Sequence, residues 1–145
     1  MVRVIEPYLG QLILEIGAGI GNISRQLPKR ELLTVSDIDE TYLRLLEDAF
    51  RGNELTQVIR LDLGSDEDSA RVSERHDTIV CLNVLEHIRD DESAFRRMRT
   101  GHSWSPRDGL CCWCRSTRRY TAPMTGNWVI SADIDMVVPI MRPPE

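Results

Sequence analysis

The sequence predicts an α/β fold with a Rossmann-like, doubly wound and mostly parallel sheet. Short apolar runs alternate with polar or amphipathic segments through residues 1–100, and the first apolar run ends in three closely spaced glycines. Alternation of this kind is typical of parallel sheets in which each helix crosses over between two strands. Ligands bind such sheets beyond the carboxyl ends of the strands, so the functional residues are expected there.

The composition of the chain changes near residue 100. The 145 residues are enough for one domain with one core. Residues 101–145, however, hold all three Trp, three of the four Cys and five of the seven Pro. A break of this size usually marks a linker or a second domain, but the second part is too short for a core of its own. We expect residues 1–100 to form the core and residues 101–145 to be an aberrant, poorly structured tail.

Charge and hydropathy limit the classes of partner and the cellular compartment that are expected for the protein. The net charge is −5 and there is no basic run, which disfavours a nucleic-acid partner. No apolar stretch is long enough to span a membrane, and no signal-peptide pattern is present. Four cysteines in such a chain do not suggest a disulfide framework, so a reducing cytoplasm is the expected location. The oligomeric state is left open.

The first expected strand, Leu12–Ile16, is a short apolar run. Three glycines follow it at alternate positions: Gly17, Gly19 and Gly21. Glycine lets the backbone turn sharply and approach a ligand closely, since it has no Cβ. A helix expected over residues 22–27 would direct free N–H groups and its positive dipole end towards that ligand. The strand, loop and helix together predict a nucleotide cradle.

Further elements follow in the order of a parallel α/β sheet. Strands are expected over the runs Leu32–Ser36, Gln57–Leu61 and Thr78–Leu82. Helices are expected over Val2–Leu9, Glu40–Phe50 and Asp91–Arg99, with a further short helix within Gly64–Arg75. The helix over residues 40–50 is the best defined, because its apolar residues fall on one side. Cys81, in the last of these strands, is interpreted as a small core residue.

An acidic pair follows the second expected strand. Asp37 lies 20 residues after Gly17, and a carboxylate at this spacing can accept hydrogen bonds from two ribose hydroxyls. Alternatively, Asp37 or Asp39 caps the next helix. We interpret Asp37 as the ribose ligand and Asp39 as the helix cap.

Polar residues also follow the third and fourth expected strands. Asp62 either accepts a hydrogen bond from an exocyclic adenine amine, with Leu61 and Leu63 flanking the ring, or is a solvated loop residue. Asn83 would face a cofactor or substrate. His87 is a candidate base or substrate contact. Alternatively, His87 and the preceding glutamate only fix the loop.

These motifs together resemble those of the class I S-adenosylmethionine-dependent methyltransferases. The matching segments are Leu14–Gly21, Val35–Asp39, Arg60–Leu63 and Asp77–Ile88. The resemblance covers residues 1 to about 100 and implies the cofactor S-adenosyl-L-methionine, methyl transfer to a nucleophile, and no metal. It assigns cofactor contacts to Glu15, Gly17, Ala18, Gly19, Gly21, Asp37, Ile38, Asp62, Leu63 and Asn83. Glu15 would support the methionine end of the cofactor, indirectly or through water.

Two alternatives stand beside this interpretation. A dinucleotide-dependent oxidoreductase would carry G-x-G-x-x-G, but Asn22 stands where its third glycine would fall. The other alternative is a non-catalytic methyltransferase-like module or an inactive fragment. The fold does not fix the methyl acceptor, and a small-molecule acceptor is expected because no basic surface suggests a nucleic acid.

After residue 100 the chain departs from the family pattern, which continues with a loop and an apolar fifth strand. The cysteines of Cys111–Cys114 lack a fourth ligand for zinc, so no metal site is expected. Read from the third base of each codon, the same stretch encodes Leu-Leu-Val. We hypothesise that residues from about 101 onward are translated out of frame. The strand ending at Leu82 would then be an open edge, with a makeshift strand from Trp128–Val138.

Overall fold

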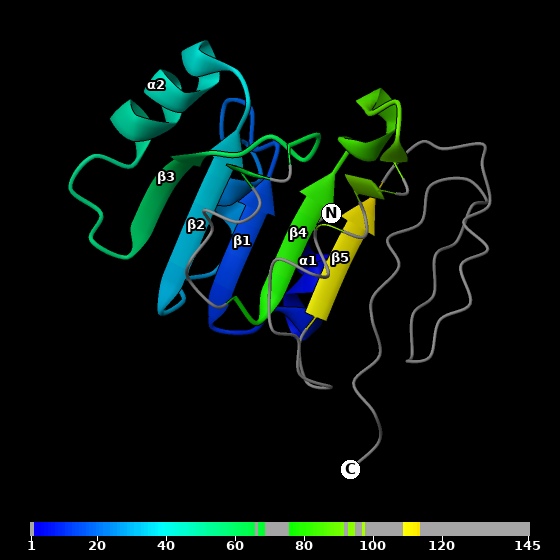
Figure 1. The fold of residues 1–145 in the computed structure, drawn as a ribbon. Coiled ribbons are helices and arrows are strands. Elements are labelled where there is room, and N and C mark those ends of the chain that lie inside the picture. The colour runs from blue at the N-terminus through cyan, green and yellow to red at the C-terminus, as the bar shows by residue number, and fades with distance from the viewer. Residues whose placement is uncertain are drawn as a thin grey trace.

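The computed structural model describes residues 2–65, 67–68, 76–91, 93–94, 97 and 109–113 of the chain. Within these residues, five strands form an all-parallel sheet with the order β3-β2-β1-β4-β5, and all five arrows point to one end of the sheet (Figure 1). The strands are β1 (Leu12–Ile16), β2 (Leu32–Asp37), β3 (Thr56–Arg60), β4 (Thr78–Leu82) and β5 (Gly109–Trp113). The predicted Rossmann-like α/β sheet is therefore confirmed, and the strand order reverses beside β1 as it does at ligand sites of such sheets.

Helix α2 (Glu40–Ala49) confirms the helix expected over residues 40–50 and ends one residue earlier than predicted. The Oδ1 atom of Asp39 accepts hydrogen bonds from the N–H groups of Thr41 at 2.7 Å and Tyr42 at 3.3 Å. These contacts satisfy two N–H groups of the first turn, so Asp39 is the helix cap, as predicted. Leu43 and Leu46 form the buried side of the helix.

Two other expected helices are shorter than predicted, because a proline limits each. The segment 2–9 is divided into α1 (Val2–Ile5) and the 3-10 turn η1 (Glu6–Tyr8), which has Pro7 in its first turn. Proline has no N–H to continue an α-helical ladder. The segment 22–27 contains only the 3-10 turn η2 (Ser24–Gln26), because Leu27, which precedes Pro28, is extended.

The central strands are buried on both faces of the sheet. One face carries a core cluster that includes Leu14, Ile16, Ile79 and Cys81, which confirms Cys81 as a core residue. The other face carries two smaller clusters: Ile5, Leu9, Ile13 and Val80, and Ala18, Val35 and Leu46. Burial on both faces explains why these strands are continuous apolar runs in the sequence.

The expectation that β4 is an open edge is wrong. The backbone of Gly109–Trp113 pairs with Thr78–Leu82 in parallel register, so β5 covers that edge. After Gly109 this segment reads Leu-Cys-Cys-Trp, and these four residues are apolar. The present sequence therefore suits a strand here, and no shift of the reading frame is needed to explain it. The makeshift strand expected over Trp128–Val138 lies outside the described residues, as do most of the helices expected over Asp91–Arg99 and within Gly64–Arg75.

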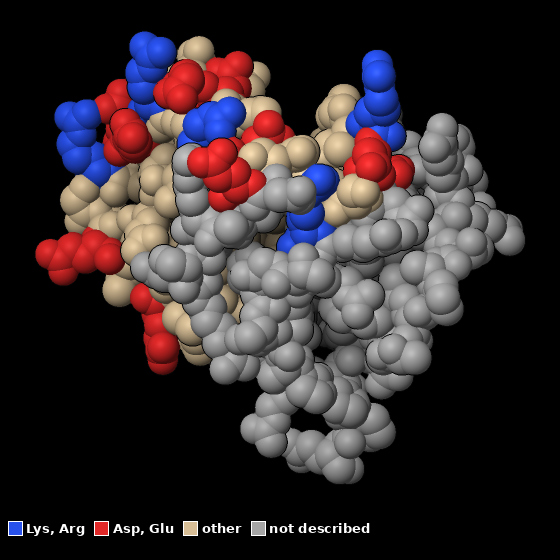
Figure 2. Space-filling view, viewed as in Figure 1, with Lys and Arg blue, Asp and Glu red and all other residues tan. Residues whose placement is uncertain are grey.

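The surface of the described residues is mixed in charge. On the face drawn in Figure 2, acidic and basic side chains lie interspersed over the part of the chain that is coloured. Among the described residues, none of the helices has both the length and the apolar character needed to cross a membrane.

Candidate cofactor site

The loop after β1 takes a conformation that glycine makes possible. Gly17, Gly19 and Gly21 have φ angles of 70°, 56° and 78°, in the left-handed region. A Cβ on Gly17 would lie 2.3 Å from Cγ2 of Val84, so the loop after β4 packs directly on this residue. A Cβ on Gly19 would meet no described atom within 4 Å. The backbone at Gly19 is therefore open on the side where its side chain would stand.

Asp37, at the end of β2, is tied to this loop. Its Oδ2 atom accepts a hydrogen bond from the N–H of Gly19 at 2.8 Å, and its Oδ1 atom accepts one from the N–H of Asp39 at 3.0 Å. The side chain is 7% exposed. A carboxylate offers about four acceptor positions, so two remain for further donors. That number equals the two ribose hydroxyls that the sequence predicts as its ligands.

The exposed side chain next to Asp37 is apolar. Ile38 is 53% exposed and Ile20, in the glycine loop, is 46% exposed. Burying such surface under a planar ring is favourable by about 25 cal/mol per Å² of apolar area. The predicted role of Ile38 in cofactor binding is compatible with this exposure.

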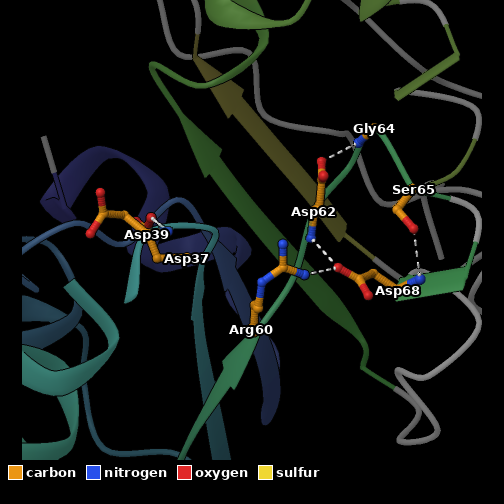
Figure 3. A network of polar contacts seen from close by, with 7 residues as sticks. All are labelled: Asp37, Asp39, Arg60, Asp62, Gly64, Ser65 and Asp68. Carbon is orange, nitrogen blue, oxygen red and sulfur yellow. Dashed lines mark hydrogen bonds and ion pairs between the residues drawn. The ribbon is translucent and has the colours of Figure 1, made fainter. Parts of the chain in front are cut away.

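Asp62 lies in a network of polar contacts just beyond the end of β3 (Figure 3). Its Oδ1 atom accepts a hydrogen bond from the N–H of Gly64 at 2.7 Å, and its own N–H donates to Oδ2 of Asp68 at 3.1 Å. Nη1 of Arg60 donates to the same oxygen of Asp68 at 2.5 Å. The contact of Arg60 with Asp68 is not predictable from the sequence, because no spacing rule links two residues whose contact depends on the path of a loop.

The leucines on either side of Asp62 belong to the core. Leu61 and Leu63 are each 5% exposed and pack in the cluster that contains Leu14 and Ile16. Little of either side chain is left for a ligand, which argues against the expectation that they flank an adenine ring.

Glu15 is a carboxyl group placed inside the sheet. It lies in register between Val35 on β2 and Val80 on β4, both fully buried, and is itself 4% exposed. Burial raises the pKa of Glu15 to about 7, while the nearby Ser24 hydroxyl lowers it by less. The contact with Ser24 falls short of hydrogen-bond geometry, because Oε2 of Glu15 and Oγ of Ser24 are buried without a partner among the described residues. A buried polar atom without a partner is costly, so this position favours an additional donor such as a water or a ligand cation.

Two exposed candidate residues, Asn83 and His87, follow β4. Asn83 directly follows β4, is exposed and has a φ of 57°, a left-handed conformation that asparagine tolerates better than most residues. His87 is the last residue of the 3-10 turn η3 (Leu85–His87) and is also exposed. Its ring makes no hydrogen bond to another described residue, and whether Glu86 fixes the loop lies outside what the structure describes.

Direct contacts join all four strand ends. Gly17 packs against Val84 after β4, Gly19 donates to Asp37 at the end of β2, and the carbonyl of Asp37 accepts from the N–H of Leu61 at 3.1 Å. The glycine loop, Asp37, Asp62 and Asn83 therefore lie along one edge of the sheet, as predicted. An open hollow of about 410 Å³ between the end of α2 and the start of β3 lies at the opposite edge and includes none of them.

One buried histidine is structural. His76 is 2% exposed, and its Nε2 lies 2.9 Å from Oγ1 of Thr34, which is 1% exposed. This contact is not predictable from the sequence, because the two residues lie 42 positions apart. It lies before β4, away from the glycine loop.

Comparison with solved structures shows the fold. The CurJ carbon methyltransferase is 24% identical with a TM-score of 0.63, over 77% of this chain and 31% of that chain. The N-methyltransferase NodS from Bradyrhizobium japonicum, in complex with S-adenosyl-L-homocysteine, is 19% identical with a TM-score of 0.60, over 74% and 54%. The [4+2]-cyclase SpnF is 11% identical with a TM-score of 0.62, over 77% and 42%. The present chain thus spans about a third to a half of these chains.

Comparison of the sequence with curated proteins gives no significant match. A family model described as a methyltransferase domain, however, matches residues 14–101, which include the glycine loop and the ends of β2, β3 and β4. The match ends where the sequence departs from the expected pattern. The chain therefore belongs to the class I S-adenosylmethionine-dependent methyltransferase family, whose domain its residues 14–101 represent.

Proposed function

We propose that this chain binds S-adenosyl-L-methionine along the carboxyl edge of its sheet, as part of an enzyme that methylates a small-molecule acceptor. The observation that carries the proposal is the hydrogen bond from Gly19 to Asp37, which places an open backbone segment beside an acidic side chain. A nucleoside with a polar tail needs both features within one short span.

The residues present fit this cofactor. The open side of Gly19 and the unpartnered oxygen of Glu15 suit the methionine part, directly or through a water. Asp37 suits the ribose, and Ile38 and Asp62 suit the adenine. The contacts that the family resemblance implies also include Gly17, Ala18, Gly21, Leu63 and Asn83. When bound, the cofactor supplies a methyl group that is activated by its sulfonium.

The residues of this chain would contribute mainly alignment. Holding a donor and an acceptor in a productive geometry removes much of the entropic barrier to their reaction. His87 is exposed beyond the end of β4, where it would accept the proton of the acceptor if the nucleophile must lose one. The structurally similar CurJ and NodS are named as a carbon and an N-methyltransferase, so the fold does not choose the atom that is methylated. The lack of a basic run in the sequence favours a small-molecule acceptor over a nucleic acid.

A second candidate function is a cofactor-binding module without catalysis. The family match ends at residue 101, and this chain covers only 31% of the CurJ chain and 54% of the NodS chain. The similarity to a [4+2]-cyclase also shows that this fold serves other reactions. The cytoplasmic location stays a prediction for either function.

Calorimetric titration of the purified chain with S-adenosyl-L-homocysteine tests the proposal. We expect binding by the wild type and a loss of about tenfold or more in affinity for Asp37→Ala, since ribose hydroxyls would lose a charged acceptor. Asp48→Ala, on the exposed surface of α2, is the matched control and should bind as the wild type does.

The wild type could bind neither this ligand nor S-adenosyl-L-methionine. In that case the same titration is made with a frame-restored chain, in which the residues from about 101 onward are translated in the alternative reading frame. Binding and transfer of a labelled methyl group by the restored chain alone would support both the function and the out-of-frame hypothesis. Absence of binding in both chains would overturn the proposed function.

A further inference from the structure

We propose that Asp68 is a positioning residue, which holds the backbone of Asp62 so that the Asp62 carboxylate faces the exocyclic amine of the cofactor's adenine. This inference rests on the proposed function and adds to the site a residue that touches no ligand. It is carried by the contacts that converge on one carboxylate oxygen of Asp68 (Figure 3).

Asp68 binds the backbone of Asp62 through a buried charge. Its Oδ2 atom accepts hydrogen bonds from the N–H of Asp62 at 3.1 Å and from Nη1 of Arg60 at 2.5 Å. Asp68 is 7% exposed, whereas the Arg60 side chain is 47% exposed. Hydrogen bonds to an ionised acceptor are roughly twice as strong as neutral ones, so the peptide of Asp62 is held firmly.

The orientation of the Asp62 carboxylate depends on that peptide. Its Oδ1 atom is already bound by the N–H of Gly64, and the Asp62 carbonyl accepts from the N–H of Ser65 at 3.0 Å. The N–H of Asp68 in turn donates to Oγ of Ser65 at 3.2 Å. The Oδ2 atom of Asp62 has no hydrogen bond to the described residues, so it is the oxygen left for a ligand. The direction of this oxygen depends on the loop from Asp62 to Asp68, which the hydrogen bond between these two residues closes.

Loss of Asp68 would loosen this loop without opening the sheet. Leu61 and Leu63 anchor the chain on both sides of Asp62, each 5% exposed in the core cluster. The core cluster in which they pack does not include Asp68. The expected effect of removing Asp68 is therefore greater freedom of the Asp62 peptide between two fixed leucines.

The direction of the Asp62 carboxylate has a chemical readout. The exocyclic amine of adenine donates a hydrogen bond to a carboxylate, whereas hypoxanthine presents a carbonyl oxygen at the same position. A carboxylate fixed at that position therefore discriminates between S-adenosyl-L-homocysteine and S-inosyl-L-homocysteine. The ratio of the two Kd values reports the position of the carboxylate, because a loss of general stability would weaken both ligands alike.

The experiment measures this ratio by calorimetry for the wild type and four variants. We expect the wild type to prefer the adenosyl ligand by about tenfold or more. Asp68→Ala should lower the ratio towards that of Asp62→Ala, while Asp68→Asn should keep most of it, since the amide oxygen can accept from the N–H of Asp62. Arg60→Gln is the matched control: it breaks the ion pair but leaves the Asp62–Asp68 contact, so the ratio should stay at the wild-type value.

The possible outcomes separate this inference from the proposed function. If neither the wild type nor the frame-restored chain binds either ligand, the proposed function is overturned, and this inference with it, before any variant is compared. If only the frame-restored chain binds, the variants are compared in that chain. A wild type that binds both ligands equally, or an Asp68→Ala ratio equal to that of the wild type, overturns the positioning role alone. If Asp68→Ala does not fold, Asp68→Glu takes its place, because it keeps the charge but displaces the oxygen from Asp62. An unchanged ratio in Asp68→Glu would likewise overturn the role.

Discussion

The backbone N–H of Gly19 donates a 2.8 Å hydrogen bond to Oδ2 of Asp37. This contact joins the loop after β1 to the end of β2, the neighbouring strand. Because Asp37 is 7% exposed, the hydrogen bond is shielded from water and fixes the loop before any ligand arrives. This edge of the sheet is therefore preorganised for the proposed cofactor.

The glycines of this loop should differ in what they contribute. Alanine at any left-handed position costs about 1–2 kcal/mol. Gly17→Ala would also force its Cβ to 2.3 Å from Val84, so it should lower the Tm further than Gly19→Ala does. Gly19→Ala places its methyl group in the open space beside the backbone and should weaken S-adenosyl-L-homocysteine binding.

Gly52→Ala is the control for backbone strain. Gly52 has a φ of 78° and, like Gly19, would place its Cβ within 4 Å of no described atom, but it follows α2 at the opposite edge of the sheet. Its Tm should fall about as far as that of Gly19→Ala, with an unchanged Kd. Equal Kd values for Gly19→Ala and Gly52→Ala would contradict a ligand beside Gly19.

The stability of the wild type should fall as the pH rises from about 4.5 to about 7. Burial raises the pKa of Glu15 from 4.5 to about 7, so the folded chain holds this proton more tightly than the unfolded chain does. The stabilisation from the protonated Glu15 is complete below the pKa that Glu15 has in the unfolded chain. It is lost as the pH rises through the pKa that Glu15 has in the folded chain. A shift of this size corresponds to about 3 kcal/mol.

Urea unfolding at pH 5 and pH 8 measures this effect against Glu15→Gln. The variant cannot ionise at this position, so its free energy of unfolding should change less between the two pH values. The interpretation of Glu15 would be wrong if the wild type and Glu15→Gln showed the same pH dependence.

Asp39→Ala should lower the Tm without weakening cofactor binding. The substitution removes the acceptor for the N–H groups of Thr41 and Tyr42 in the first turn of α2. The same two backbone hydrogen bonds lower the pKa of Asp39, so its stabilising effect is present at neutral pH and is lost as the pH falls through that lowered value. In thermal unfolding experiments, the Tm of Asp39→Ala should lie below that of the wild type at pH 7, whereas the two Tm values should agree at pH 2.

His87→Ala should slow methyl transfer without changing the Kd of S-adenosyl-L-homocysteine. General base catalysis contributes about 10²–10⁴-fold, and the exposed ring of His87 has no described partner whose loss would disturb the fold. Arg89→Ala, an exposed neighbour, is the control in a single-turnover assay with labelled cofactor. Equal rates for the two variants would exclude His87 as the base.

The parts of the fold that the sequence predicts correctly depend on local patterns. The strands Leu12–Ile16 and Thr78–Leu82 have the predicted bounds because continuous apolar runs fill both faces of a parallel sheet. The glycine loop, Asp37 and the cap at Asp39 follow from spacing and backbone chemistry.

The parts that the sequence did not predict depend on tertiary structure. The ion pair of Arg60 with Asp68 requires a loop to fold back, and the contact of His76 with Thr34 joins distant segments. The segment Gly109–Trp113 was misjudged because its composition differs from that of the family, although its residues are apolar and extend the sheet.

The strand order β3-β2-β1-β4-β5 has a consequence for synthesis on the ribosome. β1 can pair with β2 soon after both emerge, but its other edge waits for Thr78–Leu82, which are translated much later. At about 5–20 residues per second, the nascent chain exposes this apolar edge for several seconds. During that interval a chaperone that shields extended segments would protect the central strand from pairing with other chains.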